Sequence, residues 1–130
     1  MCPVYINRIA SIHAESRNEK PYFSAQEPDY KEMITNANLR RRMSRMIKMG
    51  VACGLECLKD ISPEKVDAII TATGLGCLTD TEKFMNALMD NREQMLNPTA
   101  FIQSTFNTIG AQIALLLKIH AYNVTYVHRG

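Results

Sequence analysis

Residues 97–130 read NPTAFIQSTFNTIGAQIALLLKIHAYNVTYVHRG, and this stretch decides the fold because it combines two helix starts, an apolar helix and a closing strand. Asn97 is a favourable N-cap, and Pro98 suits the first helical position, where no N–H is needed. Ser104 or Thr105 can cap a second helix. The apolar residues of that helix recur at three- and four-residue spacing, at Ile109, Ile113, Leu116 and Leu117. The pattern predicts two consecutive helices, the second largely buried.

The end of the same stretch predicts a strand. Its side chains alternate, with Val124 and Tyr126 on one face and Asn123, Thr125 and Val127 on the other. β-Branched and aromatic residues, which strands favour, dominate the segment. We therefore expect the last strand of the chain over these residues.

The N-terminal part of the chain predicts a strand, a loop and a helix. Residues 4–12 carry alternating apolar side chains, a pattern typical of a strand. Residues 13–38 show no sustained period and contain prolines, so they predict a long packed loop that covers a site or contacts a partner. Asn38 can cap a helix that runs to about Lys59.

Glycines mark the centre of the chain. Gly50 and Gly54 lie one turn apart in the predicted helix, where each costs up to ~1 kcal/mol relative to alanine, so we expect another backbone to pass close to them. Residues 66–73, VDAIITAT, predict an apolar strand buried on both faces, which Gly74 and Gly76 end. The helix that follows contains Phe84, Leu88 and Met89.

Length and composition predict one domain, residues 1–130, of the α/β class, with a mainly parallel sheet and packed helices. The 15 basic and 13 acidic side chains give a net charge of +2, which is too balanced to indicate nucleic acid or an anionic membrane as a partner. The N-terminus lacks a signal-peptide pattern, so we expect a cytoplasmic protein. The 4 cysteines are not spaced like a secreted disulfide framework, so we expect free thiols.

Four segments, in this order, resemble one known family. They are VYINRIASI at residues 4–12, LRRRMSRMIKMG at residues 39–50, VDAIITATGLG at residues 66–76 and STFNTIGAQIALLLK at residues 104–118. Together they resemble the N-terminal half of β-ketoacyl synthases, the condensing enzymes of fatty acid and polyketide synthesis. Within that family, the segments most resemble the β-ketoacyl synthase-like N-terminal domain found in bacterial polyene-pigment gene clusters. The resemblance implies a partial thiolase-like fold and a chain that is a truncated half of the complete fold.

The resemblance also implies where a nucleophile would lie. In the family, a strand like residues 123–127 leads to a reactive cysteine at the start of a buried helix. That position falls near Gly130, which has no thiol, and the family's catalytic histidines belong to the C-terminal half. We therefore assign no catalytic residue. Cys77, after the glycine turn, is the cysteine that we expect to be exposed, and it is the candidate reactive thiol.

Metal and cofactor sites are not predicted. Cys53 and Cys57 lie one helical turn apart and could bind a metal beside a histidine. Small cysteines on the apolar stripe of a helix are, however, usually core residues. The TGLG turn at residues 73–76 lacks the lysine and the full glycine pattern of a nucleotide-binding loop. We expect no metal and no cofactor.

The strongest charge feature is a basic run in the predicted central helix. At helical spacing Arg41, Arg45 and Lys48 share a face. This face is either a solvated helix surface or, by resemblance to condensing enzymes, a docking patch for an acidic acyl carrier protein. DNA binding is disfavoured because there is no helix-turn-helix pattern and no general basic excess.

The resemblance finally implies an assembly. In the condensing-enzyme fold, a strand like residues 123–127 lies at the sheet edge and pairs with the same strand of a second subunit, which predicts a homodimer or a heterodimer with a ketosynthase. The expected function is a non-catalytic, chain-length-factor-like partner subunit in fatty acid, polyketide or aryl-polyene synthesis. One alternative is an N-terminal fragment of an active 3-oxoacyl-carrier-protein synthase. Another is an unrelated small α/β interaction protein.

Overall fold

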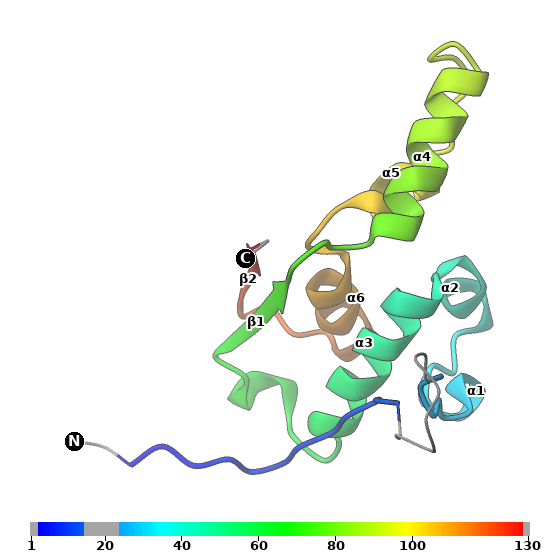
Figure 1. The fold of residues 1–130 in the computed structure, drawn as a ribbon. Coiled ribbons are helices and arrows are strands. Elements are labelled where there is room, and N and C mark those ends of the chain that lie inside the picture. Colours follow the sequence, from blue (N-terminus) through cyan, green and yellow to red (C-terminus); the bar gives the residue numbers. More distant parts are fainter. Residues whose placement is uncertain (1–2, 15–23, 129–130) are drawn as a thin grey trace.

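The computed structural model describes residues 3–14 and 24–128, in which helices accompany a short parallel sheet (Figure 1). In chain order the elements are α1 (Tyr30–Met33), α2 (Ala37–Arg42), α3 (Arg45–Cys57), the 3₁₀ helix η1 (Pro63–Lys65), β1 (Ala68–Thr73), α4 (Leu78–Asp90), α5 (Pro98–Ser104), α6 (Thr108–Leu117) and β2 (Tyr122–Val127). Helices α3 and α6 lie side by side next to the sheet, whereas α4 and α5 form a hairpin that projects away from it (Figure 1).

The sheet consists of β1 and β2, which run parallel with Ala68 opposite Tyr122 and Thr73 opposite Val127. Parallel strands need a long crossover, and helices α4, α5 and α6 supply it. The predicted last strand is therefore confirmed, and so is the parallel arrangement. Within residues 3–14 and 24–128 the sheet has two strands.

Helix α6 covers one face of this sheet. The side-chain amide of Asn123 donates a hydrogen bond of 3.0 Å to the carbonyl oxygen of Gly110 on α6. On the same face the hydroxyl groups of Thr71 and Thr125 lie 2.6 Å apart and share a hydrogen bond. A Cβ atom at Gly110 would come within 2.7 Å of the Asn123 Oδ1 atom, so glycine lets the helix lie close against the strand.

The opposite face of the sheet is bare in the part of the chain that the structure describes. Ile70 is 66% exposed, and Tyr122 and Tyr126 on the neighbouring strand are 66% and 61% exposed. The prediction that β1 is buried on both faces is therefore wrong. Only Ile69 of this strand is buried, because no described element packs over the side that Ile70 occupies.

The core lies between α3, α6 and β1. Its buried apolar side chains are Ile34, Met43, Ile47, Val51, Ala52, Ile69, Cys77, Ile113 and Ile119. A Cβ atom on Gly50 would lie 2.8 Å from the Cγ2 atom of Ile109, and one on Gly54 would collide with the Cδ1 atom of Ile113. The close approach expected at these glycines therefore occurs, but side chains of α6 make it, not another backbone.

The predicted helix that begins after Asn38 is in fact two helices. Helix α2 begins earlier, because the side chain of Asn36 accepts hydrogen bonds from the backbone N–H groups of Asn38 and Leu39. Met43 then adopts an extended conformation with ψ of 133°, and α3 starts after Ser44. The break turns the side chain of Met43 into the core, where it is only 4% exposed.

The predicted strand at residues 4–12 is wrong. The segment runs along the molecule without a neighbouring strand (Figure 1), and Val4 and Ile6 are 95% and 80% exposed. A strand needs a hydrogen-bonded partner, and the described residues provide none here. The guanidinium of Arg8 instead donates to the carbonyl oxygen of Lys59 at 2.8 Å, which holds the segment against the end of α3.

The predicted loop at residues 13–38 is partly helical. It contains α1, whose N-cap Asp29 accepts a hydrogen bond from the backbone N–H of Lys31 at 2.9 Å, and the first residues of α2. An isolated antiparallel bridge joins Ala14 to Ala25. Residues 15–23 of the loop lie outside the described residues.

The two helices before β2 are confirmed, although the second begins later than expected. Asn97 caps α5, since its side chain accepts the backbone N–H of Thr99 at 2.9 Å. Thr105 closes α5 by donating to the carbonyl oxygen of Ile102 at 2.9 Å, so α6 begins only at Thr108. In the part of the chain described, no single helix is long and apolar enough to cross a bilayer; α5 and α6 together are, but they are bent by 107°.

We predict that Gly54→Ala lowers the free energy of unfolding by about 1 kcal/mol. Overpacking against Ile113 costs about 1–3 kcal/mol, which exceeds the gain of up to ~1 kcal/mol from replacing a helical glycine. Urea denaturation measures the change. The control combines Gly54→Ala with Ile113→Val, which removes the colliding Cδ1 atom. The double variant should lose less stability than the two single variants lose in sum. Strict additivity of the two losses would contradict the packing described.

Candidate functional site

The carboxyl ends of both strands meet at one edge of the sheet. The backbone N–H of His128, just after β2, donates to the carbonyl oxygen of Thr73 at 3.1 Å. The Thr73 hydroxyl in turn accepts a hydrogen bond of 2.9 Å from the backbone N–H of Gly76. Ligand sites of open α/β sheets are usually built at this edge. The expected nucleophile position, Gly130, follows β2 here but lies outside the described residues.

The turn after β1 depends on glycine at residue 76. Gly76 has a φ of 61°, which favours a residue without a side chain. A Cβ atom there would also collide with the ring of Phe106, which comes from the joint between α5 and α6. The turn therefore brings the start of α4 and the start of α6 together beside the sheet edge.

Cys77 is not the exposed thiol that we expected. It is the N-cap of α4 and only 2% exposed. Burial raises the pKa of its thiol, and the nearby charge of Asp80 raises that pKa further. The glycine turn packs Cys77 inward against the core. Its low solvent access and its raised pKa both argue against the reactivity suggested for this thiol.

The two cysteines of α3 are half-buried free thiols. Burial raises the pKa of Cys53, and the charge of Cys57 contributes in the same direction. Residues 3–14 and 24–128 contain no group of three or more histidine, cysteine, aspartate or glutamate side chains placed to hold a metal ion.

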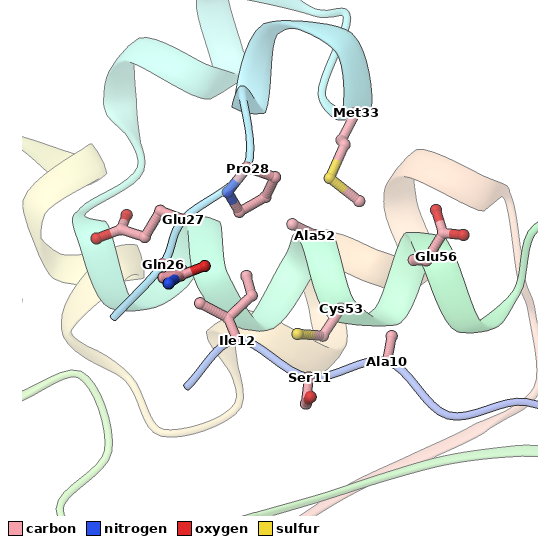
Figure 2. Close-up of a pocket in the computed structure, with 10 residues that line it drawn as sticks. All are labelled: Ala10, Ser11, Ile12, Gln26, Glu27, Pro28, Met33, Ala52, Cys53 and Glu56. Atoms are coloured by element: carbon pink, nitrogen blue, oxygen red, sulfur yellow. The ribbon is translucent and has the colours of Figure 1, made fainter. Parts of the chain in front are cut away.

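Cys53 also borders an open hollow of about 470 Å³ between α3 and the N-terminal segment. Figure 2 shows Met33 and Ile12 pointing into it from opposite sides, with Glu27 and Glu56 at its two ends. A space of this size and mainly apolar lining can hold a small apolar molecule.

The three residues of the predicted docking patch, Arg41, Arg45 and Lys48, do not share one helix face. The break at Met43 separates Arg41 from Arg45 and Lys48. The Nε atom of Arg45 donates to a carboxylate oxygen of Glu27 at 2.5 Å, so this cation already has an acidic partner within the chain.

Arg41 and Lys48 nevertheless line one open hollow of about 260 Å³, together with Lys31 and Arg40. Sequence patterns missed Lys31, because it lies in a segment without periodicity. Arg40 belongs to the same basic run but does not share the helical face on which the prediction was based.

Glu27 forms a small network with two partners. Its carboxylate accepts a hydrogen bond of 2.7 Å from the hydroxyl of Tyr30 and one from Arg45. The Tyr30 hydrogen bond, followed by that of Arg45, holds the pKa of Glu27 below its ordinary value. Burial and the hydrogen bond to Glu27 raise the pKa of Tyr30. The network ties the segment before α1 to the start of α3.

The strand predicted to form a dimer edge is β2. β2 pairs with β1 on one side, and no other described strand lies on its other side. Asn123 and Thr125 face α6, while Tyr126 is exposed on the bare face. Val124 lies opposite Ile70 and therefore on the bare face, and Val127 is opposite Thr73 at the end of the sheet.

Three comparisons with known proteins bear on this geometry. The family model described as "Beta-ketoacyl synthase, N-terminal domain" matches residues 13–125. A search of curated proteins gave no match. Among solved structures, a chain of the ketosynthase (ApeO) in complex with its chain length factor (ApeC) from Xenorhabdus doucetiae superposes with a TM-score of 0.62 and 24% sequence identity.

That superposition covers 83% of this chain and 41% of the solved chain, so the present chain spans less than half the length of that structure. It confirms the predicted fold class, a mixed arrangement of helices and a parallel sheet like part of a thiolase-like ketosynthase.

We predict that Glu27→Gln destabilises the protein most at neutral pH. Because the pKa of Glu27 is lowered in the folded state, its ionised form stabilises the fold above the ordinary pKa, and this contribution is lost as the pH falls through the folded-state value. Urea denaturation from pH 7 to about pH 3 should show the two proteins converging. Glu82→Gln, on α4 outside the network, is the matched control; a pH-independent difference for Glu27→Gln would contradict the network.

We also predict slow alkylation of Cys77. In a Cys2→Ser background, iodoacetamide should label Cys53 or Cys57 well before Cys77, because the buried thiol has little access and a raised pKa. Intact mass and peptide mapping give the order of labelling. Rapid native labelling of Cys77, at the rate seen in urea, would show that the turn does not bury it.

Proposed function

Because this chain belongs to the β-ketoacyl synthase N-terminal domain family, we propose that it is a non-catalytic partner subunit, comparable in role to a chain length factor. It would pair with a second copy or with a ketosynthase in fatty acid, polyketide or aryl-polyene synthesis. The family match rules out the alternative hypothesis that the chain is an unrelated small α/β interaction protein. The residue that the resemblance places at the nucleophile is Gly130, which has no side chain for covalent catalysis.

The observation that carries this proposal is the outer edge of β2, with which no strand of residues 3–14 and 24–128 pairs. Such an edge presents a row of free N–H and C=O groups, which invites pairing with another strand. The bare sheet face beside it exposes Ile70, Tyr122 and Tyr126, which are apolar or aromatic. Pairing of the same strand across a two-fold axis would satisfy the edge and bury part of this surface.

Acyl carrier protein is the second partner in the proposal. By the family resemblance, Arg41 and Lys48 would meet its acidic surface, whereas Arg45 would first have to leave Glu27. A cytoplasmic location is also part of the proposal. The free thiols of Cys53 and Cys57 agree with a reducing compartment.

We expect Tyr126→Lys to shift the protein from dimer to monomer. A lysine beside a strand edge adds a charge that two facing copies cannot both bury, and proteins use this device to prevent edge pairing. Light scattering over a concentration series measures the mass, with circular dichroism as a check on folding.

Tyr5→Lys is the matched control for this test, because Tyr5 is 75% exposed but lies outside the sheet. It should leave the dimer intact. The proposed pairing would be refuted if the wild-type protein stayed monomeric at high concentration, both alone and when mixed with a ketosynthase.

The second candidate function is the N-terminal part of an active 3-oxoacyl-carrier-protein synthase. The observation that favours it is that the chain covers 41% of the solved relative. Incubation with acyl-carrier-protein thioesters, followed by intact mass, separates the two functions. An acyl adduct at one residue supports the synthase, whereas carrier binding without an adduct supports the partner subunit.

A further inference from the structure

We propose that the hollow between α1, α2 and α3 is a binding site for a phosphate group. Four cationic side chains line it, namely Lys31, Arg40, Arg41 and Lys48. They come from three different elements that are brought together only by the fold. The site itself stands on this geometry, whereas identifying an acyl carrier protein as one source of the phosphate rests on the proposed function.

The first argument is the concentration of charge. The lining carries four positive side chains and one carboxylate, that of Asp29, which gives a net charge of +3. The whole chain has a net charge of +2, so all the remaining residues together carry −1. The excess of positive over negative charge is therefore concentrated around one small hollow. Such focusing raises the local concentration of anions.

The second argument is that the arginines are held in place while keeping donors free. Arg40 is half-buried, and its Nη1 atom donates to the carbonyl oxygen of Ile34. Arg41 donates from Nη2 to Asn38 Oδ1 at 2.8 Å and from Nε to the carbonyl oxygen of Ala37 at 3.3 Å. Each guanidinium has five N–H donors, so most of them remain for a ligand. A guanidinium held in position loses less entropy when it binds.

The third argument concerns which anion fits. The carboxylate of Asp29 caps α1 and offsets only one of the four positive charges, so a net charge of +3 remains in the lining. A phosphate monoester carries a charge of about −1.5 to −2 near pH 7 and offers three oxygens to donors on several sides. A carboxylate ligand would neutralise only one charge. The hollow of about 260 Å³ is also small, which suits a phosphate better than a large ligand.

The phosphate can come from two sources. One is a free phosphorylated molecule, and the other is the phosphodiester that joins the prosthetic arm to a holo acyl carrier protein. Both place phosphate oxygens against Lys48 and Arg41, but a phosphodiester carries a charge of about −1 and two free oxygens, whereas a monoester carries about −1.5 to −2 and three. The charge of the hollow therefore favours the monoester. The phosphate group is the inference common to both sources, and the experiment distinguishes them.

The test begins with inorganic phosphate as the probe. Backbone and side-chain NMR signals of the full chain are followed while phosphate replaces chloride at constant ionic strength, which removes nonspecific screening effects. Saturable shifts at Lys31, Arg40, Arg41 and Lys48 are expected. Arg41→Gln and Lys48→Gln should each weaken binding by roughly tenfold, as expected for loss of a charged hydrogen bond. Lys83→Gln, an exposed lysine on α4, should leave it unchanged.

Arg40 is left intact because its guanidinium is bonded to the backbone of the core residue Ile34. Thermal unfolding of each variant checks that it folds. Absence of saturable shifts in the wild type, or equal weakening by Lys83→Gln, overturns the site.

Apo and holo carrier protein are then compared. Tighter binding of the holo form, with competition by phosphate, supports the site and assigns the phosphate to the carrier arm. Phosphate binding with no preference for the holo form supports the site and assigns it to a free phosphorylated molecule. Phosphate binding without any carrier binding supports the site while refuting the proposed carrier docking. Carrier binding with no phosphate binding in the hollow refutes the site and leaves the proposed docking in place.

Discussion

The packing of α6 onto the glycine face of α3 is the contact on which the rest of the structure depends. Gly50 and Gly54 leave room for Ile109 and Ile113, so two helices far apart in the sequence come into direct contact. The other side of α6 can then lie against the sheet, where Gly110 permits the approach. Helix α6 therefore lies between α3 and both strands, and the glycines at these contacts set its position because they leave room for the facing side chains.

The break between α2 and α3 has the largest effect on the charged surface. A continuous helix would have presented one stripe of cations to solvent. Because the chain turns at Met43 to bury that side chain, the basic run is divided. Arg45 pairs with Glu27, and Arg41 and Lys48 face a hollow shared with α1. Burial of one apolar side chain thus decides which cations are neutralised and which are available.

Two surfaces of the sheet are exposed in the part of the chain that the structure describes. Among the described residues, the outer edge of β2 has no pairing strand and the sheet face at Ile70 has no covering element. Both are costly in water, since they expose unpaired backbone groups and apolar area. A ketosynthase of similar fold was solved in complex with its chain length factor. The carboxyl edge, by contrast, offers no exposed thiol among the described residues, since Cys77 is buried in the turn.

The sequence by itself determined the features that rest on local chemistry. Four features could be predicted: the Asn97 cap, strand β2, a close approach to the two glycines of α3, and the fold class. Caps, alternation and helical spacing act between residues that are close in the chain. The tertiary structure decided the rest. Residues 4–12 have a strand pattern but no strand partner, and the basic hollow needs Lys31, which no periodic pattern connects to α3. Pairing, burial and shared charge depend on contacts between distant segments, and local patterns do not contain them.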